Sequence, residues 1–578
     1  MNDRQRLVAA VLLMLVVWFV PMLIWPPKPN PTSGRPVGRT TRDSAQVQAR
    51  ARDTSAAPAA GLSTRPPVHP SGADTGKTIW VTSPLYRLGF STRGGRLVTA
   101  ELTNYQSFAP GDTGQPVQLV PKGSAFLRHR LALPGGDTVS LEDWSFAASP
   151  DAPGLVVYAG EGQQTLQLEA SRGGSRVALE YRFVPDEYRF IVNGTVSGLG
   201  SSGAVLLLGL ADGLQSAEKD SADDHRNYAV VTKASKTERT DLSGIKPGER
   251  ALFDGPFEWV GVKSKYFLTA ALALEEGQPA FGGAIAVGGR RADKAAPRAD
   301  VTITMPVPPA GGFRYQVYIG PLDYRHLSRI GHGLDDANPY GWIFRPIIQP
   351  VSVFVTNILL WMHEQLNLAY GWVLILFGVI VRILLWPLNQ KAMESGIRMQ
   401  AVAPLLKETQ ERYKGEPERL QREMLRIYKE HKVNPFGGCL PMLLPMPVLF
   451  ALFFVFANTI AFRGVPFLWL PDLSRPDPYY IIPLLMGLSM YALSKVGQIG
   501  VPPNPQTKMM LYFMPIFMTV LFLNFASGLN LYYAAQNIFS IPQQYLIAKR
   551  RLREAPVAKA AGAGGTTGPR SATTPSKT

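Results

Sequence analysis

One charged side chain interrupts a long apolar stretch of the sequence. Residues 368–388 (LAYGWVLILFGVIVRILLWPL) contain Arg382 and no other charged residue. A helix of this length can cross a bilayer, and Arg382 would then lie roughly 9 Å along the axis from the C-terminal end of the span. An ionised guanidinium at that depth costs at least about 2.5 kcal/mol unless water or a partner reaches it. A water-filled recess would solvate Arg382, whereas snorkelling would carry its side chain to the nearer interface; both explanations remain open at this point.

A second group of polar residues lies in the last apolar stretch, 528–548. Its members are Asn530, Tyr532, Tyr533, Gln536, Asn537, Ser540, Gln543 and Gln544. Several of them fall on one face at helical spacing, and Asn524 and Ser527 come just before the stretch. Polar groups inside a bilayer need partners or water. The pattern indicates either a hydrated groove shared with Arg382 or hydrogen bonds between helices, and the two interpretations are compatible.

The composition argues against catalysis by a metal or a cofactor. The chain has 578 residues, a net charge of +16 and a mean hydropathy of +0.01. Its single cysteine, Cys439, excludes an intrachain disulfide, and its seven histidines show no metal-ligand spacing such as HExxH. We therefore predict no catalytic residue, no metal and no cofactor. The positive charge is typical of the positive-inside rule of membrane proteins, so we predict no sequence-specific nucleic-acid partner.

The N-terminal part combines an apolar segment with a polar one. Residues 1–6 contain two arginines, and residues 7–25 form an uncharged run. A cleaved signal peptide has this pattern, but Pro26 and Pro27 stand where cleavage needs small residues, which favours an uncleaved membrane anchor. Residues 26–78 contain no Phe, Tyr or Trp, which predicts a flexible linker.

Alternating hydrophobicity between residues 79 and 340 predicts a β-sandwich. Apolar residues alternate with polar ones over 166–170 and again, after a pair of glycines, over 177–183. This pattern predicts a β-hairpin. We predict a second hairpin between 301–305 and 313–319, across a turn that contains Pro and Gly. Many short strands separated by Gly-rich turns are typical of sandwiches.

Two acidic residues and a histidine stand together within this region. They are Asp223, Asp224 and His225. We find no catalytic constellation in this region and interpret the three residues as a polar loop rather than a catalytic site. A membrane-anchored sugar-active enzyme would need a carboxylate pair in the sandwich, and the sequence does not locate one.

An amphipathic helix and a charged hairpin flank the span that carries Arg382. Apolar residues recur at steps of three and four within 343–367, which predicts a helix on the membrane surface. If this helix crossed the bilayer, the later basic segments would fall outside the cytoplasm. Residues 389–438 hold ten Lys or Arg and seven Glu, and Gly415 and Pro417 separate two apolar helical stripes. We predict a cytoplasmic helical hairpin, with a solvated charged linker as the alternative.

The remaining apolar segments complete a six-span topology. The third to sixth predicted spans are 440–462, 479–493, 509–525 and 528–548, joined by a periplasmic loop at 463–478 and a cytoplasmic loop at 494–508. Two of these spans have only 15 and 17 residues, which predicts local thinning of the bilayer. The tail 549–578 has seven Lys or Arg and one Glu. Both termini are therefore predicted in the cytoplasm and the sandwich in the periplasm.

Several stretches resemble the YidC/Oxa/Albino membrane insertases. They are GVIVRILLWPL, the charged hairpin, VNPFGGCLPMLLPMPVLFALFF, PFLWLPDLSRPDPYYIIPLLMG and SGLNLYYAAQNIFSIPQQYLI. The resemblance extends from about residue 340 to residue 550. The first span and the large domain resemble the Gram-negative branch of the family, in which WVGVKSKYF and YIGP…YGW are weaker matches.

The resemblance implies a polytopic α-helical membrane protein with a five-helix insertase core and a periplasmic β-supersandwich. It implies insertion and folding of membrane proteins in the bacterial inner membrane, alone or with the Sec translocon, and no enzymatic activity. The implied substrate groove comprises Arg382, Asn524, Ser527, Asn530, Tyr532, Tyr533, Gln536 and Asn537. The implied client contacts are Phe450, Phe454, Met486, Met514, Met518 and Leu521.

The implied partners are nascent membrane proteins, the Sec translocon and the lipid bilayer. The ribosome and the signal-recognition receptor are further candidates for the hairpin and the basic tail. Three positions depart from the usual pattern of the family, namely Gly378, Pro445 and Ala526. A secondary transporter with a polar intramembrane site remains the alternative function, although we find no inverted repeat and no intramembrane carboxylate pair.

Overall fold

The computed structural model describes most of the chain beyond residue 75. The described residues are 76–150, 154–158, 162–199, 203–289, 299–338, 345–387, 408–431, 446–500 and 508–563, with 390, 402, 405 and 406 between them. The chain divides into two compact units, Met1–Asn338 and Pro339–Thr578, close to the boundary predicted at residue 340. The predicted anchor 7–25, nearly all of the linker and the end of the tail lie outside the described residues, as does most of the first arm of the hairpin.

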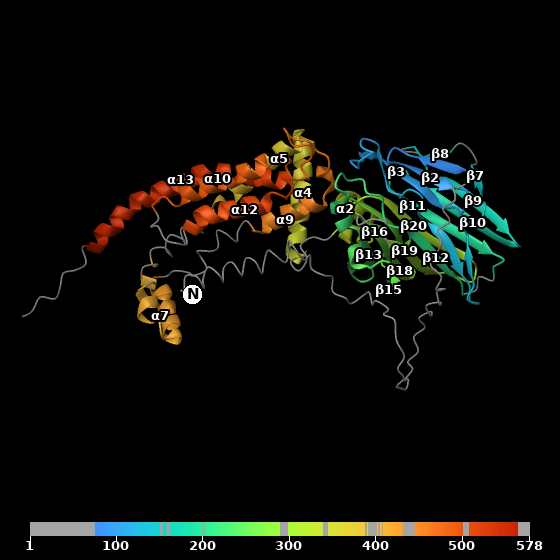
Figure 1. The fold of residues 1–578 in the computed structure, drawn as a ribbon, viewed down its shortest axis with the longest axis horizontal. Helices are drawn as coiled ribbons and strands as arrows, with labels where there is room; N and C mark the ends of the chain where they lie inside the picture. The colour runs from blue at the N-terminus through green and yellow to red at the C-terminus, as the bar shows by residue number, and fades with distance from the viewer. Residues whose placement is uncertain are drawn as a thin grey trace, which may run out of the picture. The chain divides into compact units, whose positions relative to one another are not determined.

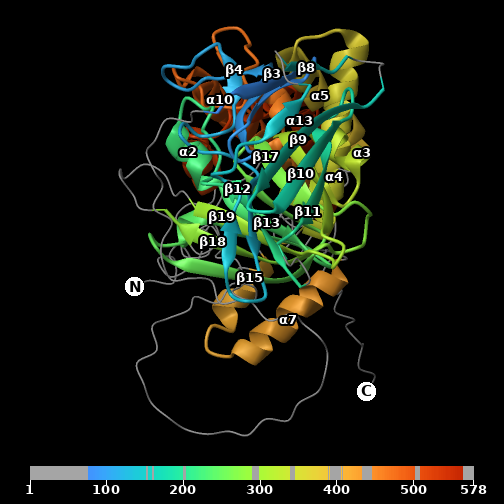
Figure 2. The ribbon, with the colours of Figure 1, turned by 90° about the vertical axis from the view of Figure 1, so that its right-hand side faces the viewer.

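The described part of the first unit contains three β-sheets (Figures 1 and 2). Their strand orders are β4-β3-β2-β1-β8, β14-β13-β16-β17-β20-β11-β10-β9-β7 and β15-β18-β19-β12-β5-β6. Neighbouring strands are antiparallel except for β1 and β8. The strands are β1 (Thr78–Thr82), β2 (Tyr86–Ser91), β3 (Leu97–Gln106), β4 (Pro116–Gln118), β5 (Arg128–Ala132), β6 (Thr138–Ser140), β7 (Ala147–Ser149), β8 (Gly154–Val156), β9 (Gln164–Arg172), β10 (Ser175–Phe183), β11 (Arg189–Ser197), β12 (Val205–Ala211), β13 (Ala229–Lys233), β14 (Thr237–Asp241), β15 (Arg250–Phe257), β16 (Trp259–Lys263), β17 (Phe267–Leu272), β18 (Phe281–Gly288), β19 (Ala299–Pro306) and β20 (Gly312–Pro321).

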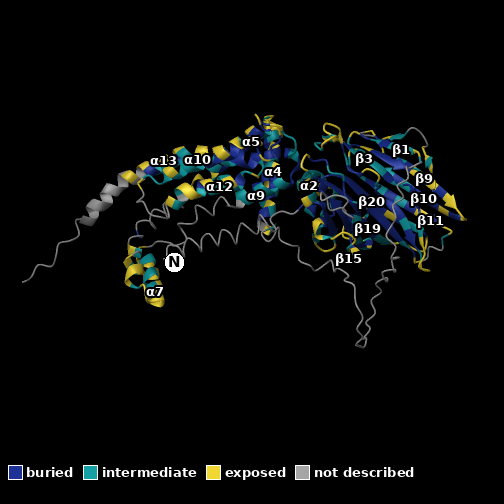
Figure 3. Ribbon diagram, in the orientation of Figure 1, coloured by how far each residue is buried: buried dark blue, intermediate teal, exposed yellow. Residues whose placement is uncertain are grey.

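The first predicted hairpin is confirmed in its strands, turn and register. In β9 and β10, Leu168 lies opposite Leu179 and Leu166 opposite Tyr181. Gly173 and Gly174 form the turn with φ of 60° and 82°, a conformation that favours glycine. Every second side chain of β10 is buried, and the same alternation runs along the neighbouring strands (Figure 3). One face of this sheet therefore forms core, as the period-two pattern predicts.

The second predicted hairpin is wrong. Strand β19 pairs with β12 and β18, whereas β20 pairs with β11 and β17. The turn at Pro308–Gly311 thus carries the chain from one sheet to another instead of folding it back within one. Both strands alternate in hydrophobicity because each presents one face to the core, and this pattern does not distinguish a hairpin from a sheet crossing.

The cluster of Asp223, Asp224 and His225 is helical rather than a loop. These residues lie in α2 (Ser221–Arg226), where the Asp220 side chain accepts from the Asp223 N–H. The Asp224 carboxylate is buried and accepts from Ser216 Oγ at 2.7 Å and from the backbone N–H of Lys265 at 3.0 Å. The Asp223 carboxylate pairs with Lys265 Nζ at 2.9 Å. The cluster therefore attaches α2 to the sheet, which is a structural role.

The described part of the second unit is helical. Its elements are α4 (Arg345–Leu366), α5 (Tyr370–Leu384), α7 (Pro417–Glu430), α9 (Met446–Asn458), α10 (Ile481–Gly497), a π-helical turn (Met509–Phe513), α12 (Met514–Phe522) and α13 (Ser527–Ala563). No single described helix is both long and apolar enough to be identified as a membrane span. The segments Ile348–Leu366 and Tyr370–Leu384 meet that criterion only as a pair, and they are bent by 119° relative to each other.

Most of the amphipathic stripe predicted within 343–367 forms the packed face of α4, although its last member, Leu366, is exposed. Ile348, Val355, Leu359 and Met362 are buried, and the last three join a core cluster with residues of α5, α9 and α13. The side chains of Phe354 and Trp361 on other faces of α4 are exposed. The sharp bend after α4 separates this helix from α5, as the sequence predicts.

Helix ends differ from the predicted spans because hydropathy and helix formation have different causes. Helix α13 continues to Ala563, well beyond the apolar limit at residue 548, because Lys, Arg, Glu and Ala in the following segment favour a helix. Helix α5 ends at Leu384, three residues before Pro387. Helix α10 begins at Ile481, where the Asp477 side chain accepts from the backbone N–H of Ile482 at 2.8 Å.

A buried histidine connects two sheets of the first unit. His129 lies on β5, and its Nε2 is 2.7 Å from the hydroxyl of Tyr315 on β20. The His129 side chain is fully buried, and its Nδ1 has no hydrogen-bond partner among the described residues. Burial lowers the pKa of His129 to about 4, because the imidazolium would lose its hydration.

We predict that the first unit loses stability in acid through His129. Its folded-state pKa of about 4 lies below the usual value of 6.5, so the folded state binds fewer protons than the unfolded state. The stabilisation is complete above pH 6.5 and is lost as the pH falls towards 4, by up to about 3 kcal/mol. Urea unfolding across this window measures the loss. The variant His129→Gln should show a clearly smaller loss, and an identical pH profile in both proteins would contradict this assignment.

Candidate functional site

Helix α13 contacts most of the other helices in the second unit. Its middle part packs on α5 and α10, and it also touches α9. The side chains of α13 that face these helices include apolar residues such as Leu531 and Ala534 and polar residues such as Asn537. The candidate site is therefore centred on α13.

Arg382 lies near the C-terminal end of α5 and is partly buried. Its Nε atom is buried and has no hydrogen-bond partner among the described residues. Tyr532 of α13 is close enough to interact with it electrostatically. No described acidic side chain forms an ion pair with Arg382. Among the described residues, no carboxylate therefore neutralises this charge.

Helices α5 and α13 pack closely at Gly378, one turn before Arg382. A Cβ atom at Gly378 would lie 3.4 Å from Cδ2 and 3.5 Å from Cε2 of the Tyr532 ring, which is an ordinary contact distance. Phe377 packs beside the same ring, with centroids 5.9 Å apart. The tyrosine ring thus lies against α5, with room for a small side chain at this position.

Neighbouring residues of α13 connect to other helices. Tyr533 packs edge-to-face on Phe522 of α12, with ring centroids 5.9 Å apart. Asn537 donates from Nδ2 to Ser489 Oγ of α10 at 3.2 Å. Ser489 in turn donates to the carbonyl of Met486 at 2.7 Å. The structure brings these polar residues together with Tyr532 on one helix, although each faces a different neighbour.

The N-terminal end of α13 is attached to the predicted loop 463–478. Ser527 donates from its backbone N–H to the Arg475 carbonyl at 2.7 Å, and its hydroxyl donates to the Asp472 carbonyl at 3.2 Å. The Gly528 N–H donates to the Leu473 carbonyl at 2.9 Å. These bonds satisfy donors that a helix start otherwise leaves free. Ser527 is fully buried in these contacts.

Three further groove candidates, Asn530, Asn524 and Gln536, differ in their exposure. Asn530 is fully buried and donates from Nδ2 to the Phe522 carbonyl at 3.0 Å. Its Oδ1 has no partner among the described residues. Asn524 is exposed in the segment between α12 and α13. Gln536 is partly buried on α13, close to Asn537 along the helix.

The predicted client contacts are distributed over three helices. Phe450 and Phe454 on α9 and Met514, Met518 and Leu521 on α12 are partly buried, and Met518 and Leu521 pack against the hydrophobic cluster. Met486 of α10 is buried inside that cluster. Its contact with a client would require the helices to move apart. The role of all six residues stays a prediction.

Two further glutamines of α13 are polar positions near the C-terminal end of the predicted span 528–548. Gln543 is buried, and neither its Nε2 nor its Oε1 has a partner among the described residues. The buried Oε1 of Gln544 also has none. Both residues belong to the polar pattern of the last stretch, but their spacing alone does not reveal that they are buried without hydrogen bonds.

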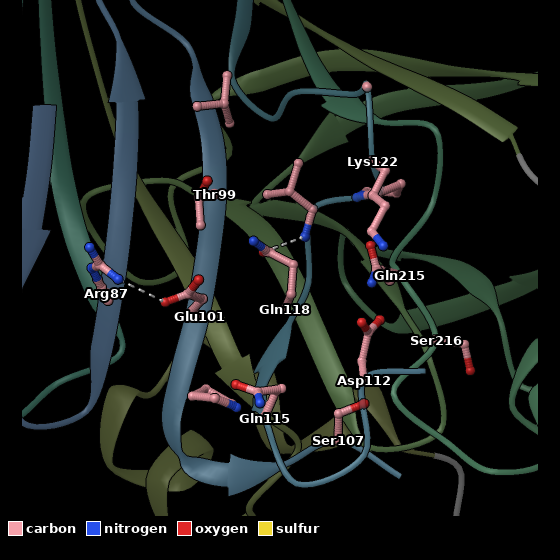
Figure 4. Close-up of a pocket in the computed structure, with 15 residues that line it drawn as sticks. Arg87, Thr99, Glu101, Ser107, Asp112, Gln115, Gln118, Lys122, Gln215 and Ser216 are labelled. Carbon is pink, nitrogen blue, oxygen red and sulfur yellow. Dashed lines mark hydrogen bonds and ion pairs between the residues drawn. The ribbon is translucent and has the colours of Figure 1, made fainter. Parts of the chain in front are cut away.

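A polar pocket of about 580 Å³ lies in the first unit (Figure 4). Some of its polar groups are already paired: Arg87 pairs with Glu101 at 3.8 Å, and Gln118 Oε1 accepts from the backbone N–H groups of Ala100 and Val120. Within the described residues, no group of three or more His, Cys, Asp or Glu side chains is arranged to hold a metal. The unpartnered polar atoms of α5 and α13 are the stronger candidate site.

Comparisons with known proteins identify the family. Residues 78–354 match the model of the YidC periplasmic domain, and residues 361–554 match that of the 60Kd inner membrane protein. The membrane protein insertase YidC of Chloroherpeton thalassium is 31% identical over 82% of this chain and 82% of its own length. The chain belongs to the YidC membrane insertase family. The YidC of Syntrophus aciditrophicus is 30% identical over 95% of this chain and the whole of its own length.

Family membership shows which unit corresponds to the periplasmic domain and which to the insertase part. YidC homologues are inner membrane proteins with a periplasmic domain, so the β-rich first unit corresponds to that domain and the helical second unit to the insertase part. A crystal structure of an active YidC insertase, with its first transmembrane domain resolved, is 16% identical. It covers 81% of this chain and 92% of its own, with a TM-score of 0.32.

Two glycines of α5 should respond differently to the same substitution. A Cβ at Gly371 would lie 2.1 Å from Cδ2 of the Phe467 ring, whereas a Cβ at Gly378 would make an ordinary contact with Tyr532. We predict that Gly371→Ala destabilises the second unit by about 1–3 kcal/mol through overpacking. Gly378→Ala serves as the matched control and should change stability by less than about 0.5 kcal/mol.

Thermal unfolding in detergent measures the difference between the two variants. Equal destabilisation by Gly371→Ala and Gly378→Ala would contradict the described packing of loop 463–478 against α5.

Proposed function

We propose that this chain inserts, folds and helps to assemble integral membrane proteins in the bacterial inner membrane, alone or together with the Sec translocon. Clients would enter a hydrophilic groove between α5 and α13 centred on Arg382. The observation that carries this proposal is the partly buried guanidinium, whose Nε has no hydrogen-bond partner among the described residues. Membership of the YidC insertase family supports the same reaction.

The groove would lower the barrier for a client without an energy-rich cofactor. The sequence contains no GxxxxGK[ST] phosphate loop, and the step that we propose uses no nucleotide hydrolysis by this chain. A hydrated recess shortens the apolar distance that the polar tail of a client must cross. A cation in that recess attracts acidic side chains, and the attraction increases as the local dielectric constant falls. It stays weak enough for release because water continues to solvate both charges.

Other polar atoms of α13 would bind water or clients on further faces of this helix. Asn530 and Gln543 are buried near opposite ends of the predicted span and contain polar atoms without described partners. A helix rise of 1.5 Å per residue separates them by roughly 20 Å, which is much of the thickness of the hydrocarbon core. Water or a client backbone would satisfy these groups in turn.

We infer six spans, five of which form the core, with both termini in the cytoplasm and the first unit in the periplasm. The charged hairpin would receive clients beneath the groove, and this hairpin and the basic tail are the candidate contacts for the ribosome and the signal-recognition receptor. In α7, Arg426 pairs with Glu430 at 2.8 Å and the helix has no buried residue, which fits a solvated segment.

A secondary transporter is the competing function. Coupled transport generally uses ionisable groups within the membrane. Helices α5, α9, α10 and α12 contain neither Asp nor Glu, and neither does α13 as far as residue 548. This composition favours the insertase.

We predict that the charge of Arg382 matters more than the shape of its guanidinium. Arg382→Lys should keep most of the activity, because it keeps the cation. Arg382→Ala should lower the insertion of a client with an Asp-rich tail about tenfold, the effect of losing about 1.4 kcal/mol. Arg382→Glu should be worse for that client, because it repels the tail. The measurement is protease-protected insertion into proteoliposomes.

The matched control is the same client with an Asn-rich tail. Its insertion should change little in any of the three Arg382 variants. If Arg382→Ala lowered the insertion of both clients equally, the electrostatic explanation would be wrong, and a role in folding or hydration would replace it.

A further inference from the structure

Residues 332–338, at the end of the first unit, are bound by a buried strand of the nine-stranded sheet. Strand β16 (Trp259–Lys263) lies between β13 and β17, and all five of its residues are buried. Trp259 and Lys263 are four residues apart, so both side chains are on the same face of the strand. This strand begins the stretch WVGVKSKYF, which matches a feature of the family but has no role in the groove.

Trp259 and Lys263 of this strand, and Glu258 just before it, bind residues 332–338. The indole Nε1 of Trp259 donates to the His332 carbonyl at 2.9 Å, and a Glu258 carboxylate oxygen lies 2.7 Å from His332 Nδ1. Lys263 Nζ donates to Asn338 Oδ1 at 2.7 Å. All five side chains are buried. We call Glu258, Trp259 and Lys263 together with His332 and Asn338 the exit clasp.

The backbone of this segment has an uncommon conformation. Gly331, His332 and Gly333 have positive φ, at 81°, 56° and 58°. The position of His332 is unfavourable for a residue with a Cβ atom. A short 3-10 turn follows at Leu334–Ala337, with Leu334 and Ala337 buried. The exit clasp therefore binds His332 before this turn and Asn338 after it.

Lys263 is an unusual choice for such a contact. Burial lowers the pKa of its ammonium group well below the ordinary value. Its described hydrogen-bond partner is the neutral amide of Asn338. An apolar residue would fill the position without that electrostatic cost. The amine instead provides a directed bond to the last residue of the first unit.

We propose that the exit clasp limits how far the periplasmic unit can move from α4, with Trp259 and Lys263 as its positioning residues. When it is closed, only residues 339–344 separate the clasped Asn338 from the start of α4 at Arg345. Chain geometry limits that connection to about 24 Å. Release of residues 331–338 raises the limit to about 50 Å. The clasp thus determines how far the periplasmic unit can move from the helix that packs on α5 and α9.

The test uses the full-length chain in lipid nanodiscs. Trp259→Phe keeps the ring and removes the indole donor, and Lys263→Met keeps most of the stem and removes the amine. Tyr181→Phe is the matched control, because it removes another buried donor of the same unit, to the Gly95 carbonyl at 2.6 Å. Hydrogen–deuterium exchange is followed at the backbone amides of Leu334 and Asp336, which are bonded within the turn.

Each clasp variant should increase the exchange rate at these two amides about tenfold, as expected for the loss of one buried hydrogen bond. The control should leave it unchanged. The double variant should increase it further, and Trp259→Phe alone decides the outcome if the double variant fails to fold. Unchanged exchange in both single variants would overturn the proposal.

A second measurement tests whether the clasp limits the movement of the two units or only stabilises residues 331–338 locally. In a Cys439→Ser background, spin labels are placed at Asp137 in the first unit and at Leu468 in the second, both of which are exposed. The distribution of distances between the labels should broaden in the clasp variants and not in Tyr181→Phe. Faster exchange with an unchanged distribution would limit the clasp to a local structural role and overturn the proposal.

Discussion

The packing of α13 on α5 beside Arg382 is the constraint on which the candidate site depends. The ring of Tyr532 lies against α5 at Gly378, one turn before Arg382, where even a Cβ atom would make only an ordinary contact. Among the described residues, no carboxylate forms an ion pair with Arg382. A carboxylate partner would neutralise the charge and compete with acidic clients. Our proposal of insertion by electrostatic attraction requires a cation without such a partner.

Buried polar atoms without described partners occur in both units. In the first unit, they include Nδ1 of His129 and Oγ1 of Thr269. In the second unit, they include Oδ1 of Asn530 and both side-chain amide atoms of Gln543, beside the core cluster. Such groups are costly in a purely structural core. In our proposal, water and clients would bind those on α13.

Local patterns predicted local structure well. The alternation at 166–183 gave the correct hairpin and register, and the three-four spacing at 343–367 gave the buried face of α4. The pairing of β19 was wrong, because alternation records which face is buried and not which strand lies beside it. Neither the contact of Gly378 with Tyr532 nor that of Lys263 with Asn338 was predictable from spacing. Both join residues far apart in the chain, and single-sequence patterns carry no information on such pairs.

Hydration of the face of α13 beside Arg382 is the most direct test of the groove. In a Cys439→Ser background, Gln536→Cys and Ile538→Cys are compared, because Gln536 is partly buried on α13 whereas Ile538 is exposed. In membranes, Ile538 should face lipid, and a charged thiol reagent reacts only where water reaches. The account predicts fast labelling at residue 536 from the cytoplasmic side, little labelling at 538, and protection of 536 by a stalled client. Labelling at 538 but not at 536 would contradict it.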